Sequence, residues 1–199
     1  MRVTPRLALA GVLLAVAALV VVGLVQLGGS GSASSSPAPS RLTVAEMNER
    51  LAGSSSPLAS LHEQAAQILP GGLPALRARL ASLHGMPIVV NKWASWCEPC
   101  RAEFGVFQRV SVARGREVAF VGIDSADSSA ASARSFLRSF PVSYPSYYDA
   151  SGAAGIAITD SSFTPVTVFF NRHGGEYIHQ GPYLQIAKLE RDVQRYALG

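Results

Sequence analysis

The chain has 199 residues, of which 48% are hydrophobic and 15% are charged, and its formal net charge is +4. This length favours one folded domain with an appendage, and two cysteines are too few for the disulfide scaffold of a small secreted domain. Arg2 and Arg6 precede an apolar run, so the rest of the chain carries 15 basic and 13 acidic residues, a balance that gives no support to nucleic-acid binding.

The apolar run at the amino end, Leu7–Leu27, has no charged residue and a single polar one, Gln26. At about 1.5 Å per residue, a helix over this run spans roughly 30 Å, the thickness of a bilayer core. Residues 1–27 are therefore predicted to be a cytoplasmic stub and a single-pass membrane anchor. A cleaved signal peptide is the alternative, since small residues follow at 30–33, but its apolar stretch usually has about 7–15 residues. The two arginines before the run place the rest of the chain outside the cytoplasm by the positive-inside rule.

Two stretches of different composition follow the apolar run. Residues 28–40 read GGSGSASSSPAPS, a composition typical of a flexible linker. Residues 41–72 are predicted to be a helical extension, with two helical pieces before Leu69. Ser56 is expected to cap the second piece and Pro57 to occupy its first helical position.

From Leu73 onward, helical and strand patterns alternate. Short apolar runs predict buried strands, and apolar spacings of three and four predict helices. The order of these elements predicts an α/β domain over residues 73–199, with a mixed central sheet flanked by helices on both faces. The predicted helices are Leu73–Leu83, Cys97–Arg114, Ser129–Phe140 and Leu184–Ala197; the predicted strands are Ile88–Val90, Val118–Ile123, Val166–Phe170 and Glu176–Gln180, with a loop rich in tyrosine and proline before Val166.

The strongest chemical signal is Trp96-Cys97-Glu98-Pro99-Cys100, which follows a predicted strand and opens a predicted helix. At a helix N-terminus the free N–H groups and the helix dipole stabilise a thiolate, so Cys97 is the expected nucleophile. Cys100 lies one turn further and can attack a mixed disulfide on Cys97. Pro99 suits the first turn, where a missing N–H costs nothing.

Other uses of this cysteine pair were weighed against redox chemistry. A structural disulfide across one helical turn would cross-link almost nothing. A zinc site needs about four ligands, and the chain has no second cysteine pair. A copper relay would need histidine or methionine ligands near the motif in sequence. The position of the motif on a strand-to-helix turn therefore favours thiol–disulfide exchange.

Glu98 bears on the direction of that exchange. A carboxylate beside Cys97 opposes a thiolate, whereas strongly oxidising proteins of this chemistry owe their power to a stabilised reduced form. Glu98 therefore favours a reductant. The alternative is that this carboxylate is solvated and screened, with no effect on Cys97.

Thr164 and Pro165, ahead of the predicted strand that starts at Val166, form a second candidate feature. A proline that opens a strand usually follows a trans bond. A cis bond here would let the preceding backbone pair with a substrate peptide beside the cysteines.

The remaining titratable candidates are given structural roles. The four histidines show neither metal-ligand nor catalytic-triad spacing, and Asp124, at the end of a predicted strand, is expected to form a turn.

The stretch Asn91-Lys92-Trp93-Ala94-Ser95-Trp96-Cys97-Glu98-Pro99-Cys100-Arg101-Ala102-Glu103 resembles the active-site strand and helix of the TlpA/ResA-like thioredoxins, and the resemblance covers roughly Leu73 to the C-terminus. It implies a thioredoxin fold and a cis bond between Thr164 and Pro165. It also implies extracytoplasmic reduction of exported protein disulfides, often of apocytochrome c during cytochrome c biogenesis, with a membrane thiol as electron donor. Beyond the redox-active disulfide, no cofactor is expected.

The resemblance also suggests a third catalytic residue. The glutamate that matches Glu103 assists proton movement near the cysteines in ResA-like members. Asn91 stands where cytoplasmic thioredoxins have a buried aspartate, so Glu103 is the better candidate for proton acceptor from Cys100. An exposed helix position for Glu103 is the alternative. Lys92 departs from the family, which usually has an aromatic residue there.

Three other functions stay open from the sequence. The same cysteines could serve a disulfide oxidase or isomerase. A peroxide-reducing enzyme is disfavoured because no Pro-x-x-x-Thr-x-x-Cys arrangement occurs. A thioredoxin-like binding module without catalysis is disfavoured because both redox cysteines are present.

Overall fold

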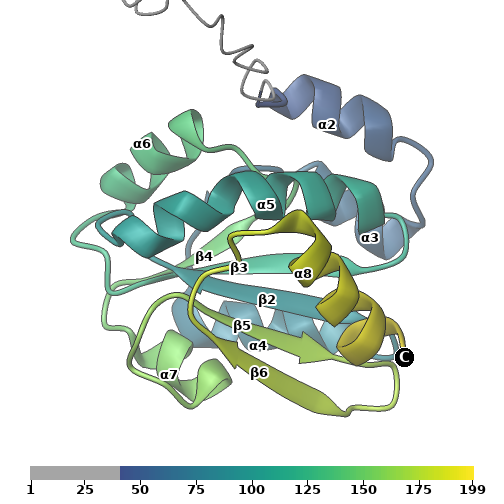
Figure 1. The fold of residues 1–199 in the computed structure, drawn as a ribbon. Coiled ribbons are helices and arrows are strands. Elements are labelled where there is room, and N and C mark those ends of the chain that lie inside the picture. The colour runs from purple at the N-terminus through teal and green to yellow at the C-terminus, as the bar shows by residue number, and fades with distance from the viewer. Residues whose placement is uncertain (1–40) are drawn as a thin grey trace, which may run out of the picture. The chain divides into compact units, whose positions relative to one another are not determined.

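The computed structural model describes residues 41–199 (Figure 1). The predicted membrane anchor and the 28–40 linker lie outside the described residues. Within residues 41–199, no helix has both the length and the apolar character that a bilayer crossing requires.

The centre of the fold is a six-stranded mixed sheet in the order β1-β4-β3-β2-β5-β6. Strands β1, β4, β3 and β2 are parallel to one another, whereas β5 runs antiparallel to β2 and to β6. This arrangement confirms the mixed sheet predicted from the order of elements. The strands are β1 (Ile68–Leu69), β2 (Ile88–Trp93), β3 (Ala119–Ser125), β4 (Ser146–Asp149), β5 (Val166–Phe170) and β6 (Glu176–Gln180).

Helices cover both faces of the sheet (Figure 1). One buried cluster joins α5, α6 and α8 to one face, and a second joins α3, α4 and α7 to the other. The helices are α2 (Val44–Leu51), α3 (Ser56–His62), α4 (Gly72–Ser82), α5 (Glu98–Arg114), α6 (Ala130–Ser139), α7 (Ala153–Thr159), α8 (Ile186–Asp192) and the π-helical η1 (Val193–Leu198).

Strand β2 is buried along its whole length, and its side chains alternate between the two faces. Val89 and Trp93 join the cluster under α5, whereas Ile88 and Val90 join the opposite cluster. Asn91 and Lys92 consequently point to opposite faces, although they are adjacent in sequence.

The helices of the amino-terminal extension pack on the rest of the fold. Thr43 and Glu46 form a reciprocal capping box at the start of α2, and Met47 and Leu51 are buried. The buried side chain of Gln108 in α5 receives a hydrogen bond from the Leu42 N–H at 3.0 Å and donates one to the Leu42 carbonyl at 2.9 Å. The extension is thereby fixed to α5.

The structure differs from the predicted elements in four places. Residues 68–69 form β1 rather than the end of a helix, and the loop rich in tyrosine and proline contains β4 and α7. The last helix changes from α to π geometry at Val193. Helix α3 begins at Ser56 itself, so Ser55 is its cap and the predicted cap was wrong by one residue.

Candidate active site

The loop between β2 and α5 carries Cys97 and is held by the residues that follow β3. Asp127, which is 3% exposed, accepts hydrogen bonds from the Ser95 N–H at 2.8 Å and from the Ser95 hydroxyl at 2.7 Å. The indole N–H of Trp96 donates to the Ala126 carbonyl at 3.1 Å. These bonds fix the loop from one side and leave the Trp96 ring largely exposed.

Cys97 and Cys100 form a disulfide at the start of α5. Cys97 is the N-cap residue and Pro99 lies in the first turn, as predicted. The backbone N–H of Cys100 donates to Cys97 Sγ at 3.2 Å. Cys97 is 4% exposed and Cys100 is fully buried, so an incoming sulfur can approach only the first cysteine. After reduction, the same N–H and the helix N-terminus can stabilise a thiolate on Cys97.

Glu98 lies on the surface beside this pair. Its carboxylate forms an ion pair with Arg101 at 3.2 Å, and both side chains are substantially exposed. The positive charge of Arg101 offsets part of the repulsion that Glu98 exerts on a thiolate at Cys97, and solvent screens the remainder.

Glu103 is fully buried, so the alternative of an exposed helix position is wrong. Asn91 Nδ2 donates to its Oε1 at 2.8 Å, and the Tyr183 N–H donates to its Oε2 at 3.1 Å. Burial raises the pKa of Glu103 to about 8, and the two donated hydrogen bonds oppose that rise. Because Cys100 and Glu103 are three residues apart on α5, their side chains share one face of the helix.

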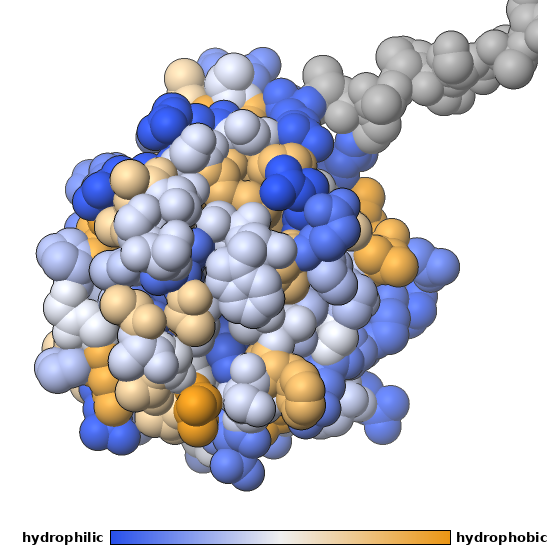
Figure 2. Space-filling model, turned by 90° about the vertical axis from the view of Figure 1, so that its left-hand side faces the viewer, coloured by the Kyte–Doolittle hydropathy of each residue, from blue (hydrophilic) through white to orange (hydrophobic). Residues whose placement is uncertain are grey.

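Two further segments lie at the same end of the central strands as the cysteine loop. The Thr164–Pro165 bond is cis, as the resemblance implies, and Val166 pairs with Lys92 near the end of β2. The Gly181 N–H donates to the Pro165 carbonyl at 3.0 Å, which brings the segment after β6 alongside. Figure 2 views the side of the molecule that carries α6 and α7, where weakly polar and apolar side chains cover much of the surface.

The cysteine loop, the segment before Pro165 and the segment after β6 each carry a large exposed apolar side chain. Trp96 precedes Cys97, Phe163 precedes the cis bond, and Leu184 follows Tyr183; each is more than half exposed. Phe163 and Leu184 could not be predicted as site residues from the sequence, because a lone apolar residue in a loop carries no spacing signal.

A group of buried charges behind the loop was also missed. Asp124 lies within β3, so the expectation that it forms a turn was wrong. Neither of its carboxylate oxygens has a hydrogen-bond partner within residues 41–199. Burial, together with the neighbouring carboxylates of Asp127 and Asp149, raises the pKa of Asp124 to about 9. Burial and the neighbouring carboxylates therefore favour the protonated form of Asp124.

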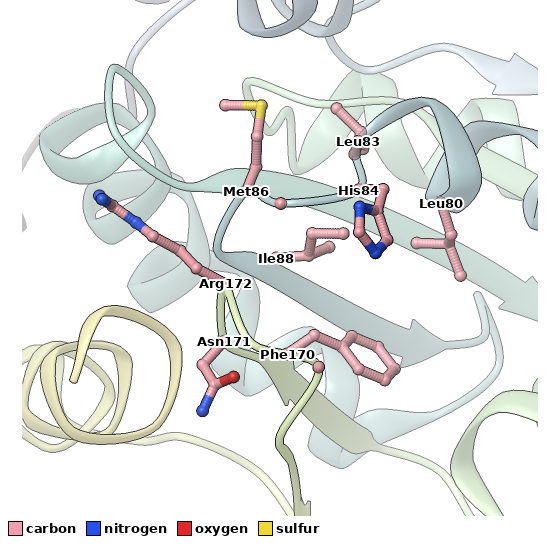
Figure 3. Close-up of a pocket in the computed structure, with 10 residues that line it drawn as sticks. Leu80, Leu83, His84, Met86, Ile88, Phe170, Asn171 and Arg172 are labelled. Carbon is pink, nitrogen blue, oxygen red and sulfur yellow. The ribbon is translucent and has the colours of Figure 1, made fainter.

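A cavity of about 190 Å³ lies at the other end of β2, near Ile88 (Figure 3). Leu80, Leu83 and Phe170 contribute apolar walls, and His84 lies at its rim. Neither cysteine lines this cavity, so it is separate from the candidate active site.

The comparisons with known proteins agree with this geometry. The Redoxin family matches residues 75–181. The thiol-disulfide oxidoreductase ResA of Bacillus subtilis is 28% identical over 99 residues, which cover 49% of this chain and 54% of that protein. The thioredoxin-like protein YneN of the same organism is 27% identical over 78 residues, which cover 38% of this chain and 46% of that protein. The chain thus spans about half the length of these relatives.

Solved structures support the fold. A secreted Mycobacterium tuberculosis disulfide oxidoreductase, homologous to DsbE of E. coli, has a TM-score of 0.53 and 26% identity, covering 58% of this chain and 85% of that one. A thioredoxin-related protein from Neisseria meningitidis serogroup B has a TM-score of 0.51 and 28% identity, covering 60% and 91%. These matches confirm the thioredoxin fold and the resemblance to ResA-like proteins. The chain belongs to the Redoxin family.

Proposed function

We propose that this chain is a membrane-anchored thiol–disulfide oxidoreductase that reduces disulfides of exported proteins, with apocytochrome c as a candidate client. The observation that carries the proposal is the Cys97–Cys100 disulfide at the N-terminus of α5, with the buried carboxyl of Glu103 on the next turn. The names of the relatives, a thiol-disulfide oxidoreductase and a disulfide oxidoreductase, support the same chemistry.

The proposed cycle starts from the dithiol. Cys97 attacks one sulfur of the client disulfide as a thiolate, and the other client sulfur leaves as a thiol after taking up a proton. The thiolate of Cys100 then attacks Cys97 Sγ, which releases the second client thiol and leaves the Cys97–Cys100 disulfide. Two electrons pass to the client, and a membrane thiol donor returns two to this chain.

The neighbouring residues have separate roles in this proposal. Glu103 takes the proton from Cys100, for which a pKa of about 8 is well matched to a thiol. Trp96, Thr164 and Pro165 contact the client beside Cys97. The negative charge of Glu98 disfavours a thiolate on Cys97, and its ion pair with Arg101 and the solvent reduce this effect.

The reduction potential distinguishes a reductase from an oxidase or isomerase. We expect the Cys97–Cys100 couple to lie nearer the thioredoxin value of about −270 mV than the DsbA value of about −120 mV. The measurement is equilibration of the purified domain with glutathione buffers of defined ratio, followed by quantification of free thiols. A potential near the DsbA value would exclude the reductase assignment and favour the oxidase.

The location of the redox domain is a separate prediction. We expect the protein in the membrane fraction, with its cysteines open after mild reduction to a thiol reagent that cannot cross the membrane. A cytoplasmic thiol protein serves as the control that must stay unlabelled. Recovery of the protein in the soluble cytoplasmic fraction would contradict the assignment.

A further inference from the structure

Lys92 occupies a position where a charge is unexpected. It lies in the middle of the sheet on a strand buried from end to end, and it is 1% exposed. Lysine is almost never fully buried without a partner, because an ammonium group loses its hydration there.

The ammonium group of Lys92 reaches the loop before the cis bond. Lys92 Nζ donates to the Ser161 carbonyl at 2.6 Å in a buried hydrogen bond. The hydroxyl of Thr159 donates to the Gly155 carbonyl at 2.7 Å and lies 3.3 Å from the Ser161 carbonyl. The Ser161 hydroxyl accepts from the Phe163 N–H at 3.1 Å. Hydrogen bonds to the carbonyl and to the hydroxyl of Ser161 therefore hold the turn that leads to Pro165.

Helix α7 leaves room for the lysine side chain. A Cβ atom at Gly155 would clash with Ser125 Oγ and lie 2.7 Å from Lys92 Cε, so any other residue there would displace these side chains. The Gly155 N–H donates to the Asp149 carboxylate at 2.8 Å, and this carboxylate is the nearby negative charge. Burial lowers the pKa of Lys92, whereas the charge of Asp149 raises it. The ammonium group of Lys92 therefore lies among strand β2, helix α7 and the carboxylate of Asp149.

We propose that Lys92 is a positioning residue for the client: it ties the strand that leads to Cys97 to the loop that carries Phe163, Thr164 and Pro165. This inference rests on the proposed function and adds to it a determinant of client docking. Lys92 points to the face of the sheet opposite Asn91 and Glu103, so its loss should disturb docking and leave the chemistry of the cysteines intact.

The test is the Lys92→Met variant, because methionine has a similar length and is flexible enough to fill the site without a donor. We expect the KM for reduction of insulin, used as the protein disulfide, to rise about tenfold, which corresponds to loss of one charge-assisted hydrogen bond. The rate with a small aromatic disulfide and the equilibrium with glutathione should stay within about twofold, since neither needs the loop. Amide hydrogen exchange at residues 161–164 should become faster.

Two further variants keep the test decisive. Gly155→Ala places a methyl group against the side chains of Lys92 and Ser125 from the α7 side, and it should reproduce the insulin defect even where Lys92→Met folds poorly. Ile88→Val removes a buried methylene-sized group at the far end of β2 and controls for general destabilisation, so its KM should not change.

The outcomes separate the two proposals. An unchanged KM for insulin in both Lys92→Met and Gly155→Ala overturns the positioning role. An equal loss with insulin and with the small disulfide also overturns it, because the effect then acts on the cysteines. A wild-type protein that reduces neither disulfide contradicts the proposed function instead, and hydrogen exchange at 161–164 still decides whether Lys92 fixes the loop.

Discussion

Cys97→Ser should abolish disulfide exchange, whereas Cys100→Ser should accumulate mixed disulfides with client proteins. The expected nucleophile is the cysteine at the helix N-cap, because its sulfur accepts a hydrogen bond from the Cys100 N–H and only this cysteine of the two has exposed surface. Loss of a nucleophile lowers turnover by several orders of magnitude. Without Cys100, the bond between Cys97 and the client forms but cannot be resolved from within the chain.

The measurement is recovery of covalent adducts on non-reducing gels after rapid acid quenching, with identification of the trapped sulfur by mass spectrometry. The double variant, with serine at both positions, is the matched control and should give no adduct. Adducts on the Cys97→Ser protein, together with none on Cys100→Ser, would reverse the assignment of nucleophile and resolving cysteine.

Glu103→Gln should change both the pH dependence of exchange and that of stability. With a pKa of about 8, Glu103 is mostly protonated at pH 7 and becomes a proton acceptor as the pH rises through 8. The introduced glutamine cannot take the proton of Cys100, so exchange should slow, with a flatter pH–rate profile. Asn91 Oδ1 has no partner within the described chain, so its amide can turn and accept from the new side chain.

The stability effect has a defined sign. Because the folded pKa of Glu103 lies above its unfolded value, the folded state binds the proton more tightly. The stability that this proton contributes is fully present below about pH 4.5 and is lost as the pH rises to about 8. Between about pH 4.5 and pH 8 the wild type loses this stability and Glu103→Gln does not. The free energy of unfolding of the variant, relative to that of the wild type, should therefore increase by as much as ~4 kcal/mol over this range.

Urea unfolding across pH, run beside the exchange assay, measures this difference. Glu63→Gln changes an exposed glutamate and should follow the wild-type curve, so it controls for the charge change alone. Parallel stability curves for wild type and Glu103→Gln would contradict the raised pKa. Identical pH–rate profiles would remove Glu103 from the mechanism and leave the two cysteines.

The sequence could predict those features of the site that depend on neighbours along the chain. The CxxC motif, the strand before it and the helix after it follow from local periodicity, and they place Cys97 at a helix N-terminus. Strand β6 has the bounds that were predicted, because a glycine-containing turn separates it from β5. Short elements such as β1 and β4 were missed, since they are defined by pairing across the sheet rather than by their own pattern.

The contacts that tune the site come from distant parts of the chain. Glu103 receives a hydrogen bond from Tyr183, which is 80 residues away, and Lys92 donates to Ser161, 69 residues away. A sequence without an alignment gives no measure of such pairings. It can nominate Glu103 as a candidate, but the fold is needed to show that this residue is buried and which groups face it.

The alternation of β2 has a consequence for how such a protein can diversify. Asn91 and Lys92 are adjacent in sequence, yet Asn91 faces Glu103 on α5 and Lys92 faces the loop before Pro165. On the roles proposed for Lys92 and Glu103, substitutions at position 92 should alter which clients are accepted without retuning proton transfer, and substitutions at position 91 should do the reverse. Strand β2 would then offer two independent controls, one for client range and one for reactivity, which selection or protein engineering could adjust separately.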